Sequence, residues 1–193
     1  GLALFTVDRM KLSVDGATVR VGGSRVTGEF FWVLGISPEL GRTVDANDDQ
    51  PGKGRVAVIS HAMWQSRFGS DRGVLGKNLL LGLPSTDGAR PYRIVGVMPP
   101  GFAFPHGAEN IETIGKTTDV WVPWAMTPQE RASRDDNQGT AIGRLRPGVS
   151  PAMAQAEMSA IVARFDPLHP VIFRGATAVI RPLEVSITGA SRR

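Results

Sequence analysis

The chain has 193 residues, of which 41% are hydrophobic and 21% charged, and this globular composition excludes a largely disordered chain. It contains no cysteine, which excludes disulfides, thiolate metal sites and cysteine nucleophiles. The net charge of +4 comes mainly from arginines dispersed along the sequence. A nucleic-acid-binding protein gathers such residues into a stripe, so we expect no nucleic-acid partner.

Hydropathy predicts no membrane-spanning segment. No apolar run approaches the roughly 20 residues that cross a bilayer, and no basic start leads into the apolar stretch of a signal peptide. If the domain lies outside the cytoplasm, we expect segments beyond it to direct it there.

The first predicted elements are a strand and a short helix. Residues 17–27 alternate and are rich in β-branched side chains, which predicts a strand with a bulge or bend at Gly22 and Gly23. Residues 28–34 carry aromatic and aliphatic side chains typical of a short helix that packs on a sheet. Gly35 follows where a left-handed C-cap is common.

A middle block follows a predicted loop over residues 36–52. The apolar run at 56–59 predicts a buried strand, Ser60 an N-cap, and the next residues a helix with Trp64 and Phe68 on one face.

Three more strands are predicted in the middle block. Residues 79–83 and 92–98 form the pattern of a β-hairpin with a long connection. Residues 120–122 indicate a short strand, and residues 127–136 a helical turn followed by loop.

The last third has the clearest pattern. Residues 140–145 predict a strand, and Ser150 followed by Pro151 predicts a helix start. The side chains that share one face of this helix are Ala154, Met158, Ile161 and Phe165. Residues 176–183 predict a final strand. The whole order of elements indicates an α+β fold in which a middle block is inserted between β-α units.

No set of polar residues forms a convincing catalytic constellation, so we predict no catalytic, cofactor-binding or metal-binding residues. Ser60 and His61 are adjacent, yet neighbouring residues at a helix start point apart, and capping accounts for the serine. His106 and His169 are isolated in predicted loops, and the acidic pair at residues 135–136 is better interpreted as solvated.

A calcium-like pattern occurs in the first predicted loop. Asp45, Asn47 and Asp49 place oxygen ligands at alternate positions, but Gln50 and Val56 stand where a calcium loop needs glycine and glutamate. An acidic turn is the better interpretation. The glycines at 22–23 and 52–54 lack the strand-to-helix context of a phosphate-binding loop.

The remaining aromatic residues allow two interpretations. Trp121 and Trp124 flank Pro123 and suit either an interaction surface or core packing. The residues that we predict to be mainly core are Phe30, Phe31, Trp64, Phe68, Met158, Ile161 and Phe165.

Three blocks of sequence, taken in order, resemble the periplasmic core domain of MacB-like ABC-transporter permeases. They are RVTGEFFWVLG at 25–35 with GRT at 41–43, VAVIS at 56–60 with RFG at 67–69, and IVGVMP at 94–99 with DVWVP at 119–123. RLRPGVS at 144–150 also fits. The pattern is most similar to that of the large orphan permeases abundant in acidobacteria.

This resemblance implies a two-lobed periplasmic domain. A porter-like lobe of β-α-β units would be built from residues 1–46 and 138–193, and residues 47–137 would form a smaller inserted α+β lobe. The domain would lie on the periplasmic side of the bacterial inner membrane, anchored by transmembrane helices outside this segment.

The resemblance also implies a non-enzymatic role in export. The domain would transmit conformational change from the membrane and ATPase parts to the periplasm and dock partners, while ATP hydrolysis resides in a separate domain or subunit. The implied partners are its own transmembrane helices, a cytoplasmic ATPase, and a periplasmic adaptor or a second permease copy. No cofactor is implied.

A cargo-binding domain for a small molecule, peptide or lipid is the alternative. A deep apolar pocket lined by Phe30, Phe31, Trp64 or Trp121 would favour it, whereas a solid core would favour force transmission. In the transmission hypothesis both termini emerge on one side of the domain, with the strands at 17–27 and 176–183 in one sheet.

Overall fold

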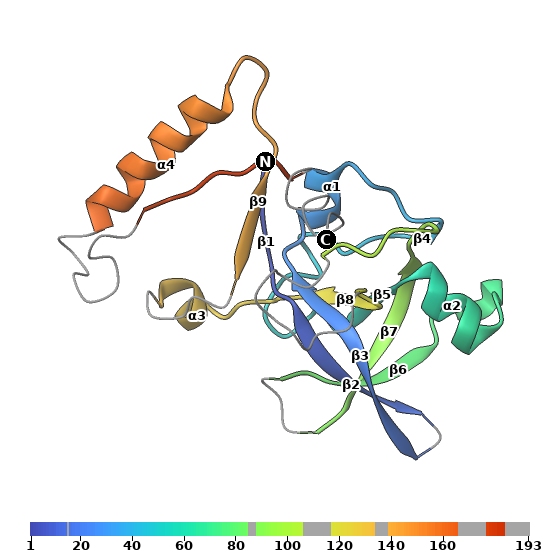
Figure 1. The fold of residues 1–193 in the computed structure, drawn as a ribbon. Coiled ribbons are helices and arrows are strands. Elements are labelled where there is room, and N and C mark those ends of the chain that lie inside the picture. Colours follow the sequence, from blue (N-terminus) through green and yellow to red (C-terminus); the bar gives the residue numbers. More distant parts are fainter. Residues whose placement is uncertain (15, 85–87, 106–116, 134–138, 166–176, 184–193) are drawn as a thin grey trace, which may run out of the picture.

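The computed structural model describes residues 1–14, 16–84, 88–105, 117–133, 139–165 and 177–183 (Figure 1). Within them one nine-stranded sheet is formed. Its strands are β1 (Leu2–Phe5), β2 (Asp8–Val14), β3 (Ala17–Val26), β4 (Leu40–Gly41), β5 (Val56–Ile59), β6 (Asn78–Gly82), β7 (Arg90–Val97), β8 (Val120–Pro123) and β9 (Thr140–Gly143). The helices are α1 (Phe30–Leu34), α2 (His61–Phe68), the 3-10 turn η1 (Arg72–Val74), α3 (Pro128–Ala132) and α4 (Pro151–Phe165). This mixture of elements confirms the predicted α+β class.

Six of the strands close on themselves as a barrel. Pairings run from β2 to β6, β7, β5, β8 and β3, and β3 pairs again with β2. The pairs β3–β8 and β5–β7 are parallel, and the others in the ring are antiparallel. We call these six strands the barrel. Closure leaves no unpaired sheet edge within the ring.

A two-stranded arm extends the sheet beyond the barrel. β1 and β9 pair along their whole length in antiparallel register, with Leu2 opposite Gly143 and Phe5 opposite Thr140. We call these two strands the arm. The arm joins the barrel through β3, because Phe5 of β1 is the partner of Val26. Strand β3 is therefore common to both parts (Figure 1).

The two faces of the central strands bury two separate hydrophobic cores. Ala57 and Ile59 of β5 point into the barrel, where Met63 and Trp64 of α2 join them, whereas Val58 packs in the second core. The second core lies between the barrel, the arm and α1, and contains Phe30, Phe31 and Trp121 among its members. Burial on both faces explains why β5 and β8 are continuous apolar runs rather than alternating ones.

Two glycines in β3 serve close approach and not a bend. The predicted bulge at Gly22 and Gly23 is wrong, because the β2–β3 register runs through both without interruption. A Cβ at Gly22 would collide with the carbonyl oxygen of Thr117, and a Cβ at Gly23 would collide with the side chain of Met10. Neighbouring groups therefore fill the space that a side chain would need.

The predicted boundary between two lobes does not separate two sheets. Strand β2 pairs with β6, and β3 pairs with β8, so the described strands of residues 47–137 belong to the same sheet as β2 and β3. The physical reason is that the apolar runs of β5 and β8 complete the barrel that the hairpin of β2 and β3 begins. The grouping of residues 138–193 with 1–46 as a porter-like lobe stays a prediction, since residues 166–176 and 184–193 lie outside the described part.

The C-terminal elements differ from their prediction. Helix α4 forms as expected and buries Ala154, but Met158 and Ile161 of its apolar stripe are exposed. Phe165 is half-buried. Residues 177–182 do not form a strand, because the backbone at Ala178 and Ile180 is bonded to the side chain of Gln155 instead of a neighbouring strand. The prediction that both termini emerge on one side of the domain involves residues 184–193, which lie outside the described part.

No helix in the described part of the chain is long and apolar enough to cross a membrane.

Candidate functional site

Ser60 caps α2 through its side-chain hydroxyl. Its Oγ accepts a hydrogen bond from the Met63 N–H at 3.0 Å, in the extended conformation of an N-cap. His61 faces a different partner, since its Nδ1 lies 2.7 Å from Oε2 of Glu39. The capping interpretation is confirmed, and Ser60 and His61 do not form a nucleophile–base pair. His106 and His169 lie outside the described residues.

We expect Ser60→Ala to lower the free energy of unfolding by about 1 kcal/mol, because the Met63 N–H loses its acceptor. Urea unfolding followed by circular dichroism measures this loss. Ser66→Ala changes an exposed serine of the same helix and is the matched control, with an expected change below about 0.5 kcal/mol. Equal losses in the two variants would contradict the capping role.

Asp119 directly precedes β8 and faces Ser60; in the sequence it stands out only as the first residue of the DVWVP block. Its Oδ1 lies 3.5 Å from the Ser60 Oγ, and the Ser60 N–H donates to its backbone carbonyl at 2.8 Å. Burial raises the pKa of Asp119, although hydrogen bonds from Gly22 and Ser60 counteract part of this effect. The Asp119 carboxyl group therefore lies where the end of β5 meets the start of β8.

The acidic run at residues 45–49 is held by the protein's own groups. Arg42 pairs with Asp48, with 3.0 Å between Nη2 and Oδ1, and Oδ1 of Asp45 accepts the N–H groups of Asn47 and Asp48. These contacts confirm the acidic-turn interpretation. Within the described ranges, no three His, Asp or Glu side chains are grouped so that they could hold a metal ion. The acidic pair at 135–136 lies outside those ranges.

Asp49 is buried and ties three segments together. Its Oδ1 accepts the Ala125 N–H at 2.7 Å, and its Oδ2 accepts the Gly28 N–H at 3.3 Å. Gly28 precedes α1 and Ala125 follows β8, so the carboxylate connects both to the acidic turn. Burial raises the pKa of Asp49, and the two hydrogen bonds offset this in part.

We expect the stability difference between the native chain and Asp49→Asn to depend on pH. Because the folded-state pKa of Asp49 is raised, the folded protein keeps this proton at a pH where the unfolded chain has lost it. Its contribution is therefore fully present below the unfolded pKa and decreases as the pH rises through the folded pKa. Urea unfolding of both proteins from about pH 4 to about pH 7 measures the difference. A native advantage that grows with pH would contradict the assigned shift.

Side chains join β3 to the connection between β1 and β2. The Arg25 N–H donates to Oγ1 of Thr6 at 3.0 Å, and Oγ of Ser24 donates to the Thr6 carbonyl at 2.6 Å. The Thr6 hydroxyl donates in turn to Asp8, whose Oδ2 also accepts the Arg25 Nε–H at 2.9 Å. These contacts lie where the chain leaves the arm and enters the barrel.

An aromatic ring extends this cluster toward β9. The guanidinium carbon of Arg25 lies 5.3 Å from the ring centre of Trp124, a cation–π distance. The same ring fills the space beside Gly139, where a side chain would collide with it. We call Thr6, Asp8, Ser24, Arg25 and Trp124 the junction. The only sequence pattern that points to the junction is the proximity of Trp124 to a predicted strand end.

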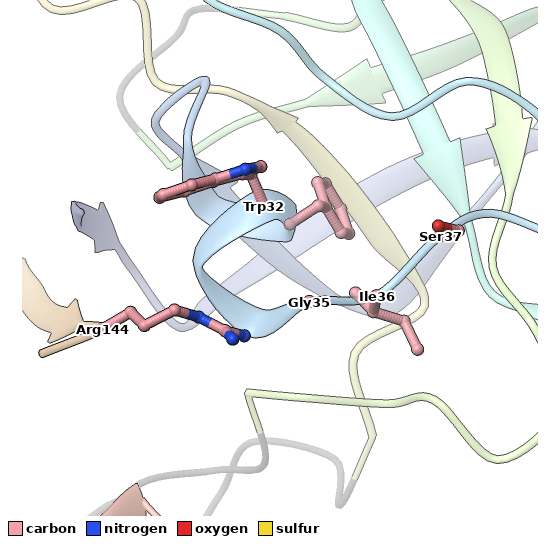
Figure 2. Close-up of a pocket in the computed structure, with 6 residues that line it drawn as sticks. Trp32, Gly35, Ile36, Ser37 and Arg144 are labelled. Carbon is pink, nitrogen blue, oxygen red and sulfur yellow. The ribbon is translucent and has the colours of Figure 1, made fainter. Parts of the chain in front are cut away.

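A shallow hollow of about 340 Å³ surrounds the end of α1 (Figure 2). Arg144 reaches it from the end of β9 and donates from Nε and Nη2 to the Val33 carbonyl at 3.1 and 3.0 Å. Gly35 closes α1 with φ 70°, and a Cβ there would lie 2.6 Å from Nη2 of Arg144. The first and last sequence blocks therefore meet at the C-terminal end of α1, where the helix dipole favours a positively charged group.

A second hollow of about 300 Å³ runs beside β1, bordered by Leu2, Leu4, Met126 and Arg131 among others. Of the aromatic residues considered for a cargo pocket, Phe30, Trp64 and Trp121 border neither hollow and lie in the packed cores. Phe31 borders the first hollow while remaining 1% exposed. The second tryptophan of the pair, Trp124, is half-buried at the junction.

The fold and these sites define a structural α+β module, in which buried polar side chains hold segments of backbone together. The family model described as the MacB-like periplasmic core domain matches residues 4–161. The chain therefore belongs to the family of MacB-like periplasmic core domains of ABC-transporter permeases, and lies on the periplasmic side of the membrane.

Two solved structures illustrate the similarity in fold. The periplasmic region of MacB from Actinobacillus actinomycetemcomitans matches with a TM-score of 0.62 and 13% identity, over 100% of this chain and 76% of that one. The extracellular domain of the noncanonic ABC-type transporter YknZ from Gram-positive bacteria matches with a TM-score of 0.59 and 18% identity, over 88% of this chain and 75% of that one. A comparison with curated protein sequences gave no match.

Proposed function

We propose that the domain transmits conformational change from the membrane and ATPase parts of a permease to partners in the periplasm, without catalysis of its own. The observation that carries this proposal is the continuity of the sheet. Strand β3 belongs to both the arm and the barrel, so displacement of the arm acts on the barrel through hydrogen-bonded backbone.

The packing of the body supports this role. The barrel interior is filled by side chains from all six strands and from α2, and the second core fills the space between the barrel, the arm and α1. Close-packed interiors are weakly compressible and transmit strain. A displacement applied at one end of such a body reaches the other end with little loss.

Cargo binding has less support. The two hollows are shallow, and the four aromatic side chains considered for a cargo pocket pack in the two cores. Cargo sites for small molecules are concave and bury most of the ligand surface, which these hollows do not offer.

The proposed partners follow from the family. They are the transmembrane helices of the same permease, a cytoplasmic ATPase, and either a periplasmic adaptor or a second copy of the permease. The adaptor and the second copy are alternatives within the proposal.

Flexible linkers test the proposal in the complete permease. We expect long Gly/Ser linkers, placed where the domain connects to its two transmembrane helices, to abolish the ATP-dependent displacement of the domain. Such linkers are flexible random coils and transmit little force. Spin labels on Lys11 and in the membrane part measure the displacement, and the absence of native cysteine in this chain keeps the domain label unique. Rigid helical linkers of equal length are the control. Displacement that survives the flexible linkers would overturn the proposal.

A further inference from the structure

We propose that Arg25 is a positioning residue that fixes the arm to the barrel, so that the two turn as one body. This inference rests on the proposed transmission function and assigns the residues through which it passes. The path runs from Asp8 of β2 through Arg25 of β3 and the ring of Trp124 to Gly139, which directly precedes β9.

Arg25 suits this role because its contacts have fixed directions. The Asp8–Arg25 pair is nearly buried, with side chains 11% and 10% exposed, and the Nε–H to Oδ2 bond constrains the plane of the guanidinium. The guanidinium carbon lies over the ring of Trp124, which in turn occupies the space beside Gly139. The second core also packs against both parts, but apolar contacts are not directional, whereas the bonds of Arg25 define an angle between the parts.

The local backbone explains why side chains are needed here. Two hydrogen bonds join Thr6 to Arg25. One connects backbone groups, from the Thr6 N–H to the Arg25 carbonyl at 2.9 Å. Its counterpart is made by the Thr6 hydroxyl, which accepts the Arg25 N–H. The Thr6 hydroxyl thus completes one pair of the ladder, beside the neighbouring Leu4–Thr27 pair. The same hydroxyl donates to Asp8, which also accepts the Arg25 Nε–H.

Distance measurements within the intact chain test this inference without membrane or ATP. Spin labels at Lys11 on the barrel and Ala141 on the arm, both exposed, report the arrangement of the two parts by pulsed electron paramagnetic resonance. We expect a single narrow distance distribution in the native chain. Arg25→Met and Trp124→Leu should both lose it and give a broad distribution, while Trp124→Phe, which keeps an aromatic face, should restore the narrow one.

Matched controls separate the junction from general destabilisation. Arg9→Met changes an exposed arginine on β2, and Leu80→Ala changes an exposed apolar side chain on β6; both should keep the native distribution. Trp124→Leu leaves the Asp8–Arg25 pair intact, so it remains informative if Arg25→Met unfolds. Distributions as narrow as the native one in Arg25→Met or in a folded Trp124→Leu would overturn the inference. Such a result would leave the linker experiment, and hence the transmission proposal, unaffected.

Discussion

Truncating Trp121 to alanine should lower the free energy of unfolding by about 3–5 kcal/mol, the range for large aromatic side chains in closed cores. Trp121 is fully buried, and its ring lies 5.3 Å from that of Phe102 and 6.1 Å from that of Phe31. Its Nε1–H also donates to the Phe104 carbonyl at 2.9 Å. The variant would leave a cavity and an unsatisfied carbonyl, and chemical denaturation monitored by circular dichroism measures the sum.

Trp32→Ala is the matched control for this prediction. Trp32 is 65% exposed on α1, and its truncation should change the stability by less than about 0.5 kcal/mol. Trp121→Phe should fall between the two, because it keeps most of the ring volume and loses the hydrogen bond. Similar losses for Trp32→Ala and Trp121→Ala would show that the second core is misplaced.

Removing Asp8 should be about as costly as removing a core aromatic. Asp8→Ala leaves the nearly buried guanidinium of Arg25 without its anion and the Thr6 hydroxyl without its acceptor. Breaking one side of a buried ion pair costs about 3–5 kcal/mol, because the remaining charge is left desolvated. Thermal and urea unfolding of the variant measure this loss.

A double-mutant cycle separates the pair from the desolvation penalty. Asp8→Ala combined with Arg25→Met should recover much of the loss, since replacement of both charges by apolar groups is often near neutral. Lys77→Ala, which breaks the exposed Asp71–Lys77 pair and leaves Asp71 as the cap of η1, should have a far smaller effect and is the control. Strictly additive losses in the cycle would contradict a direct interaction between Asp8 and Arg25.

Local sequence patterns predicted most of the individual elements. The apolar run at 56–59, the cap at Ser60, the hairpin at 79–98 and the C-cap at Gly35 carry strong local signals, and all are found. Strands β1 and β2 were missed, although Met10, Leu12 and Val14 alternate in the pattern of a strand. The family resemblance, now confirmed, came from the order and spacing of blocks rather than from any one of them.

The arrangement of the elements was harder to predict, because it depends on pairings between distant residues. Nothing in β2 or β6 alone indicates that they pair with each other, and this pairing closes the barrel across the predicted lobe boundary. The glycines at 22–23 illustrate the same limit, since the groups that fill the space beside them come from Thr117 and Met10. The junction could not be predicted for the same reason, as Asp8, Arg25 and Trp124 come from separate parts of the chain.

The closed barrel also has a consequence for how the chain folds. Strand β3 must pair with β8 in the barrel, and β1 must pair with β9 in the arm, so both pairings join residues that lie about a hundred positions or more apart in the sequence. The chain loses loop-closure entropy before it gains the favourable energy of such contacts. Folds dominated by non-local contacts therefore form slowly, on the order of milliseconds to seconds. Until β8 is available, the first hairpin exposes the outer edge of β3 and the apolar face of β2. A chain that is delivered with its N-terminus first must therefore pass through a stage in which strand edges are unpaired. A chaperone that shields those edges would act before residue 120 is available.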